Sequence, residues 1–373
     1  MKKILLGTTA VIALGTMTTE AFAADKIALG LGGFMKHYVG LGKNDEVAST
    51  SSAAERGKDI GQKSNTEVYF TGSTTLDNGI KVAARIEMEA DGAATNNIDR
   101  SYLTVSSEAM GSVVVGHAPH YGNSAAVRVP QVTGLDWGDT DGWGGTATSS
   151  TTTTTTFSNA TGGGSRAMDT FGGDSVKLKY TSPSFSGFSV GASYSAAEAS
   201  NASEARLVVA AQDGYSYGAT YSGEMSGVGI SADLTHNDYD TAYSFNHFGL
   251  NLSMAGFTVG GGYKDFNDTR STPIAPAGDD INDGNGWELG VAYKTGPYSV
   301  AAGYMTAKRS GTVATAGDDK DTKWSVAAAY DLGASVALTA NYYNAKADVE
   351  GTGTDANKSR TISGVIAGIE VGF

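Results

Sequence analysis

The segment WELGVAYK, residues Trp287–Lys294, shows the pattern on which the fold depends. Trp287, Leu289, Val291 and Tyr293 alternate with residues that are polar or very small. Successive side chains of a β-strand point to opposite faces, so a period of two predicts a strand with one apolar and one polar face.

The same alternation recurs along the chain, for example in Gly214–Ser222 and Val228–Thr235. In the first strand we expect Gly32-Gly33 to shift the alternation. Leu29 and Leu31 have odd residue numbers and Phe34 an even one, so in an uninterrupted strand they would lie on opposite faces. Counting the alternating runs predicts sixteen strands, near residues 27–40, 66–76, 80–89, 98–107, 112–117, 175–182, 187–196, 206–222, 227–238, 243–254, 257–264, 286–294, 298–308, 322–331, 335–345 and 360–373.

The connections between these strands alternate in length. Short turns are expected at residues 77–79, 108–111, 183–187, 225–227, 255–256, 295–297 and 332–334. Long polar loops are expected near residues 41–65, 90–97, 118–174, 197–205, 239–242, 265–285, 309–321 and 346–359. This order predicts an all-β fold, a transmembrane antiparallel β-barrel with short periplasmic turns and long extracellular loops.

Composition agrees with a barrel. The chain has 51 Gly and 18 Tyr among 373 residues, and its mean hydropathy is only −0.18. Beyond the N-terminus, no run of about 20 apolar residues predicts a membrane helix. Half of each strand of a transmembrane barrel faces water, so a moderate mean hydropathy is expected.

Aromatic residues recur six positions apart near the ends of five strands. Two aromatic girdles at the membrane interfaces would produce this spacing, and the core of a soluble barrel is the alternative. The last strand, 360–373, reaches the C-terminus and is expected to pair with the first and close the barrel. The aromatic pairs are Phe188 and Tyr194, Phe257 and Tyr263, Trp287 and Tyr293, Tyr298 and Tyr304, and Trp324 and Tyr330.

The pattern of the N-terminal residues indicates a targeting segment. Lys2 and Lys3 precede a short apolar run, Ile4–Met17, and Ala21-Phe22-Ala23 is a small-residue cleavage pattern. We expect a cleaved signal peptide over 1–23 and a single barrel domain over 24–373. The alternative, a membrane anchor, is disfavoured because the apolar run is short.

Several segments resemble the general bacterial porin family, especially its alphaproteobacterial members. They are Ser73–Gly79, Ile98–Leu103, Tyr180–Phe188 and the terminal Phe373. The resemblance implies a homotrimer of sixteen-stranded barrels in the outer membrane, through which ions and small hydrophilic solutes diffuse passively. It also implies that loop 3, matching 118–174, folds into the lumen as a constriction, although its Thr-rich part, 146–156, departs from the family pattern.

Charge on both sides of this constriction is the expected functional feature, since a pore discriminates by radius and lining charge. We expect a weak cation preference from the acidic balance of the chain. The acidic side would be formed by loop residues Asp136, Asp139 and Asp141. The basic wall would be formed by the inward-facing Lys81, Arg85, Arg100, Lys177 and Lys179.

Other readings of these residues remain open. The acidic loop could be merely solvated, or could hold structural calcium, but residues 136–142 lack a full EF-hand pattern. His117 and His120 lack an obvious third metal ligand, so we expect no metal and no cofactor.

The predicted partners are the outer-membrane bilayer and small solutes. A net charge of −13 argues against nucleic acid. No G-x-S-x-G or P-loop pattern stands in a suitable context, so we expect no enzyme activity. The alternatives are a solute-selective channel for sugars or anions, an outer-membrane hydrolase, and a structural or adhesive barrel.

Overall fold

The computed structural model describes residues 26–46, 60–91, 98–133, 175–196, 213–238, 244–267, 283–310, 318–349 and 358–373. The expected signal peptide and the loop residues Asp136, Asp139 and Asp141 lie outside these ranges. Within them, no helix is both long enough and apolar enough to cross a membrane.

The described chain forms sixteen strands and one short helix, α1, Tyr121–Ala125. The strands are β1 Ala28–Glu46, β2 Ile60–Thr75, β3 Lys81–Glu89, β4 Ile98–Ser107, β5 Gly111–His117, β6 Val176–Thr181, β7 Phe188–Ser195, β8 Gly214–Met225, β9 Val228–Asp238, β10 Ser244–Met254, β11 Phe257–Asn267, β12 Gly284–Thr295, β13 Tyr298–Ser310, β14 Asp318–Gly333, β15 Val336–Val349 and β16 Lys358–Gly372.

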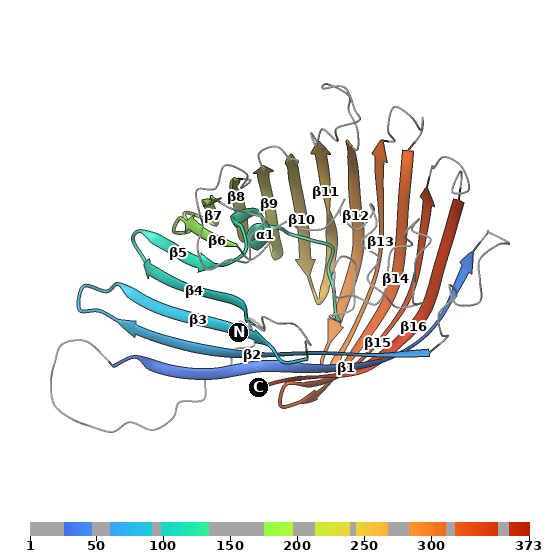
Figure 1. Cartoon of the computed structure of the whole chain (residues 1–373), viewed down its shortest axis with the longest axis horizontal. Helices are drawn as coiled ribbons and strands as arrows, with labels where there is room; N and C mark the ends of the chain where they lie inside the picture. The colour runs from blue at the N-terminus through green and yellow to red at the C-terminus, as the bar shows by residue number, and fades with distance from the viewer. Residues whose placement is uncertain are drawn as a thin grey trace.

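Every strand pairs antiparallel with its neighbours in sequence, and β1 pairs with β16 to close the barrel (Figure 1). The sixteen-stranded barrel predicted from the alternation is therefore confirmed. Closure satisfies the backbone groups of both terminal strands and leaves no free edge. One end of the barrel, the turn rim, carries the short turns, and the opposite end is called the loop rim.

Several strands extend further toward the loop rim than predicted. β1 continues to Glu46, and β2 already begins at Ile60. These extensions are mainly polar, so they lack the apolar side from which a strand is recognised. Backbone pairing with the adjacent strand keeps these extensions in the β conformation. Hydrophobic alternation carries no information on that pairing, so the extensions were not predicted.

The alternation in β1 is continuous, which corrects the expected shift at Gly32-Gly33. Leu29, Leu31 and Met35 are exposed on the same outer face, and β1 pairs with β2 in one unbroken register. Phe34 points inward instead, where its ring centre lies 6.1 Å from that of Tyr69. The prediction was wrong because it assumed that every large apolar residue in the strand faces outward.

Aromatic residues surround most of the outer surface. Both members of all five predicted pairs lie on the outer face of their strands. Rings of adjacent strands pack together, with centres 5.2 Å apart for Trp287 and Tyr304 and 5.1 Å apart for Trp324 and Tyr342. Large apolar side chains are thus directed away from the barrel centre, as expected for contact with lipid.

One sector of the outer surface departs from this pattern. The described outer faces of β16 and β1–β5 carry aliphatic side chains, with Phe70 and the terminal Phe373 as their aromatic residues. Residues such as Leu103, Val115 and Val365 are exposed there. The aromatic girdles therefore do not continue around this sector in the described chain.

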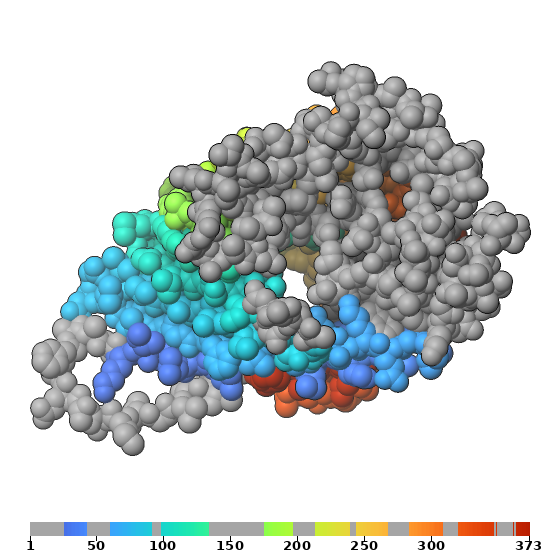
Figure 2. Space-filling view, viewed as in Figure 1, coloured from blue at the N-terminus to red at the C-terminus, as the bar shows by residue number. Residues whose placement is uncertain are grey.

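The barrel interior is polar. Buried side chains on the inner face include Glu87, Asp233, Lys264 and Glu288. In the space-filling view an opening remains beside the blue-to-green strands (Figure 2). This arrangement, apolar outside and polar inside, is the reverse of a soluble barrel with a dry core.

Candidate pore constriction

The inner wall of β3 and β4 carries a group of opposite charges. The Glu87 carboxylate binds the Arg85 guanidinium through one oxygen and accepts a hydrogen bond of 3.2 Å from Arg100 Nη1 through the other. The Glu87 side chain is 4% exposed, whereas those of Arg85 and Arg100 are 32% and 35% exposed. Arg100 Nε also lies 3.7 Å from Asp99 Oδ2, so two arginines and two carboxylates form one ion-pair network on this part of the wall.

Tyr69 of β2 orients Arg85 from the adjacent strand. The guanidinium carbon of Arg85 lies 4.2 Å from the centre of the Tyr69 ring, a cation–π contact. The Tyr69 hydroxyl donates a hydrogen bond of 2.7 Å to Glu67 Oε2. The position of Arg85 is therefore determined by two strands.

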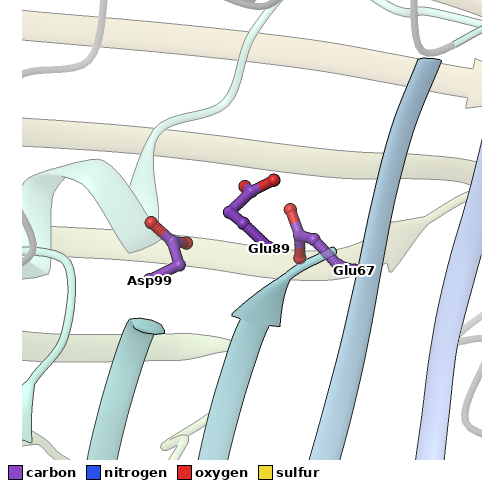
Figure 3. Close-up of side chains that lie close together, drawn as sticks. All are labelled: Glu67, Glu89 and Asp99. Carbon is purple, nitrogen blue, oxygen red and sulfur yellow. The ribbon is translucent and has the colours of Figure 1, made fainter. Parts of the chain in front are cut away.

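An acidic group lies beside these arginines, on the loop-rim side. One carboxylate oxygen from each of Glu67, Glu89 and Asp99 lies within 4.8 Å of the others, and the three side chains converge in the lumen (Figure 3). The register shifts where β3 meets β4, between Glu87 and Met88, and this irregularity accommodates Asp99 beside Arg100. Carboxylate oxygens are ligands for Ca²⁺ and Mg²⁺, so within the described ranges this group has the chemistry to attract a divalent cation.

The three lysines of the predicted basic wall lie in different environments. Lys81 is on the inner face of β3 near the turn rim and is exposed. Lys177 is only 2% exposed, and its ammonium group donates a hydrogen bond of 2.6 Å to Ser175 Oγ. Lys179 Nζ lies 2.9 Å from Ser124 Oγ of α1. Lys81, Arg85 and Arg100 thus contribute exposed charge to the wall, whereas Lys177 is covered.

Beyond β5 the chain enters the lumen and follows the inner wall. Residues 118–133 include α1, which lies inside the barrel against β6–β9 (Figure 1). The Tyr121 amide donates to Ser193 Oγ of β7 at 2.9 Å, and the Gly122 amide donates to Ser216 Oγ of β8 at 2.7 Å. Buried backbone donors need such partners, and here the inner wall supplies them.

Two buried carboxylates hold the next part of this segment. Asp233 Oδ1 of β9 accepts a hydrogen bond of 2.7 Å from the Val127 amide. Glu288 Oε1 of β12 accepts hydrogen bonds from the Val129 amide at 2.7 Å and from Arg128 Nε at 2.9 Å. The segment therefore crosses the inner face from β7 to β12.

The other oxygen of Asp233 orients a histidine. Asp233 Oδ2 lies 2.8 Å from His247 Nδ1 of β10, and the Asp233 side chain is fully buried. Since a carboxylate accepts hydrogen bonds, His247 Nδ1 is the donor in this contact. Asp233 thus connects two strands of the wall to the loop segment.

Glycines on the wall allow the segment to approach closely. A Cβ atom on Gly249 of β10 would lie 1.9 Å from the Val127 carbonyl oxygen. A Cβ atom on Gly191 of β7 would lie 2.1 Å from the Tyr121 ring. Burial beside this wall raises the pKa of the Tyr121 phenol above its ordinary value, so the phenol remains neutral. The wall therefore has depressions at the places where the segment lies.

Sequence reasoning missed these anchoring residues. Asp233 and Glu288 occupy the polar positions of predicted strands, which is the available signal. Nothing in the spacing of the sequence connects them with Val127 or Arg128, because the loop and the wall meet only when the barrel closes.

The closed barrel, its polar interior and the peptide segment along its inner wall define a transmembrane β-barrel channel. A family model described as Gram-negative porin matches residues 8–350. The chain therefore belongs to the Gram-negative porin family, which confirms the predicted resemblance. Membership and fold make it an outer-membrane protein through which ions and small hydrophilic solutes diffuse passively.

Solved structures share this fold. The trimer form of OmpT, an outer membrane protein of Vibrio cholerae, has a TM-score of 0.61 and 13% identity, covering 94% of this chain and 100% of that one. An anion-selective porin from Comamonas acidovorans has a TM-score of 0.58 and 17% identity, covering 93% and 100%. The channel DcaP of Acinetobacter baumannii has a TM-score of 0.59 and 14% identity, covering 93% and 98%. No curated protein sequence matches the chain.

Proposed function

We propose that the protein is a general diffusion channel whose narrowest section lies between loop 3, residues 118–174, and the inner wall of β2–β4. The observation that carries this proposal is the binding of Val127, Arg128 and Val129 to the buried carboxylates Asp233 and Glu288. These contacts keep the start of the loop inside the barrel, where it reduces the open cross-section.

The proposed channel prefers cations weakly. Asp136, Asp139 and Asp141 of loop 3 form its acidic side, and Lys81, Arg85 and Arg100 belong to the opposite wall. Lys177 and Lys179 carry basic charge on β6, on the side where the loop itself packs. The exposed arginines attract anions, but Glu67, Glu89 and Asp99 concentrate negative charge beside them. Opposite charges that face each other across the pore order the water between them. An apolar solute would have to displace this water at a cost in free energy, so the passage of apolar solutes is disfavoured.

Conductance of the purified protein in planar bilayers tests this function. A general diffusion channel gives a conductance that rises with salt concentration without saturating, and salt-gradient reversal potentials with a small cation preference. Inhibition of the ion current by a sugar at saturating concentration would instead establish a solute-selective channel. Absence of conductance would overturn the proposal.

Catalysis is not part of the proposed function. The described residues contain one buried Ser–His contact, in which Ser193 Oγ lies 2.8 Å from His120 Nδ1. His120 is fully buried, and Ser193 also accepts the Tyr121 amide hydrogen. This serine is engaged in holding the loop and is closed to a substrate.

We further propose that the chain is exported with a cleaved signal peptide, residues 1–23, and assembles as a homotrimer. Family membership and the trimeric OmpT relative support the trimer. The sector formed by β16 and β1–β5 is its contact surface, because this sector lacks the girdles that anchor a barrel in lipid interfaces. Light scattering of the detergent-solubilised protein tests the assembly, and a monomer would overturn it.

A further inference from the structure

We propose that His37 is the polar contact of the surface through which copies of this chain associate, and that its imidazole hydrogen-bonds to a neighbouring copy. The inference rests on the proposed trimer and names a residue that determines its stability. It starts from the side of the strand on which His37 lies.

His37 is on the outer face of β1. It shares parity with Met35 and Val39, which are 53% and 41% exposed, and it is itself exposed. Its direct neighbours across the sheet are Ile369 of β16 and Ser64 of β2. The imidazole is therefore directed away from the water-filled interior.

The depth of His37 is close to the middle of the apolar band. Gly33 exchanges two backbone hydrogen bonds with the C-terminal residue Phe373, at 2.9 and 3.1 Å. His37 lies four residues further along β1, which is about 13 Å at about 3.3 Å per residue. Because the strands of such a barrel are tilted by about 35–45°, this distance corresponds to about 10 Å of depth. The outward apolar band is about 25 Å tall, so the imidazole lies well inside it.

Lipid cannot satisfy this side chain. No hydrogen bond or ion pair to the imidazole comes from any residue in the described ranges. Charged residues of the adjoining strands do not share its face, because Lys36, Glu370, Lys63 and Glu67 all point into the barrel. An imidazole N–H without a partner in hydrocarbon is unfavourable, and an ionisable residue at this depth indicates a protein contact.

A second copy of the chain is the occupant that fits. The surrounding face consists of six strands about 4.8 Å apart over a band about 25 Å tall, or about 700 Å² per chain. In a ring of three copies each chain uses this face against two neighbours, so the three contacts together bury about 2,100 Å², or three times about 700 Å². The same face offers hydroxyl groups, including exposed Ser64 and the outward Ser101 of β4, and a ring of identical copies brings different parts of one face together.

A spin label at position 37 tests whether the residue contacts protein or lipid. The chain has no cysteine, so His37→Cys introduces a unique labelling site, and Leu289→Cys supplies a control on the girdled outer face of β12. In lipid vesicles we expect low oxygen accessibility and dipolar broadening for the label at 37, and high accessibility without broadening at 289. Equal oxygen accessibility at the two positions would overturn the proposal.

The stability of the assembly tests the hydrogen bond itself. His37→Leu keeps an apolar side chain on the contact surface but removes both ring nitrogens, whereas His37→Asn keeps a hydrogen-bond donor and an acceptor. We expect the dissociation constant of the detergent-solubilised assembly to rise about tenfold for His37→Leu, because the hydrogen bond to the neighbouring copy is lost. It should rise less than about threefold for His37→Asn.

The control for the loss of an outward histidine is His236→Leu, on the outer face of β9, which should leave the dissociation constant of the assembly unchanged. Failure of the trimer and failure of this inference are distinguishable. A wild type that is monomeric overturns both. A trimer whose dissociation constant is unchanged in His37→Leu overturns only the role of His37.

Discussion

The Arg128 guanidinium is bound by the Glu288 carboxylate in a two-pronged contact, with Nε to Oε1 at 2.9 Å and Nη2 to Oε2 at 3.2 Å. The two residues are 160 positions apart in sequence. Glu288 is fully buried and Arg128 is 18% exposed, so this charge-assisted pair is shielded from solvent. It connects the loop in the lumen to a strand of the wall.

Glu288→Gln should loosen the loop without unfolding the barrel. The amide retains the shape of the carboxylate but loses its charge, and hydrogen bonds to charged groups contribute about 1.5–3 kcal/mol. We expect a lower thermal unfolding temperature and greater open-channel current noise in bilayers. The matched control is Glu224→Gln at the exposed turn-rim end of β8. Equal noise in the two variants would show that Glu288 does not hold the loop.

Gly249→Ala should displace the loop from the wall. The added methyl group would collide with the Val127 carbonyl oxygen, and overpacking of this kind typically costs about 1–3 kcal/mol. We expect altered single-channel conductance together with reduced thermal stability. Gly372→Ala at the turn-rim end of β16 is the control, because its Cβ atom would lie 3.4 Å from Ser335 Cβ, an ordinary van der Waals distance. A wild-type conductance in Gly249→Ala would mean that the loop does not need this close approach.

Removing the positive charge of Arg85 should increase cation preference. Arg85→Gln leaves the neighbouring carboxylates less compensated, so reversal potentials in a salt gradient should shift toward the cation equilibrium potential. Arg85→Lys keeps the charge and should remain close to wild type. The shift should be larger in 0.01 M salt than in 1 M salt, where the screening length is only about 3 Å. Unchanged reversal potentials would remove Arg85 from the conducting path.

Lys177 should behave differently from Arg85 despite its position on the same inner wall. Its ammonium group is buried against Ser175, so Lys177→Met should affect stability more than selectivity. Leaving buried acceptors without a donor costs about 1–3 kcal/mol, which urea unfolding measures. A selectivity change as large as that of Arg85→Gln would show that ions sense this charge directly.

Neutralising the acidic group should have the opposite effect on selectivity. Asp99→Asn removes one of three carboxylates that converge in the lumen, and we expect a reduced cation preference together with a weaker effect of added Ca²⁺ on the current. Asp331→Asn, at the exposed turn-rim end of β14, is the control. If both variants keep the wild-type cation preference, the group does not contribute to selectivity.

Alternation by itself determined the class of fold. Residues such as Trp287, Leu289 and Val291 indicate that one side of the strand contacts an apolar medium. This pattern can be recognised from neighbouring residues of one strand alone. The order of turns and loops then predicted the antiparallel barrel, and parity correctly assigned Arg85 and Arg100 to the inner face.

Only the tertiary structure decided how the lumen is filled. The contacts of Asp233 with Val127 and of Glu288 with Arg128 join segments that are 106 and 160 positions apart. The burial of Lys177 and the convergence of Glu67, Glu89 and Asp99 likewise depend on barrel closure and on a shift in strand register. Parity states which face a side chain occupies, but the distance between two inward side chains depends on how the whole sheet curves, and that information is not local in the sequence.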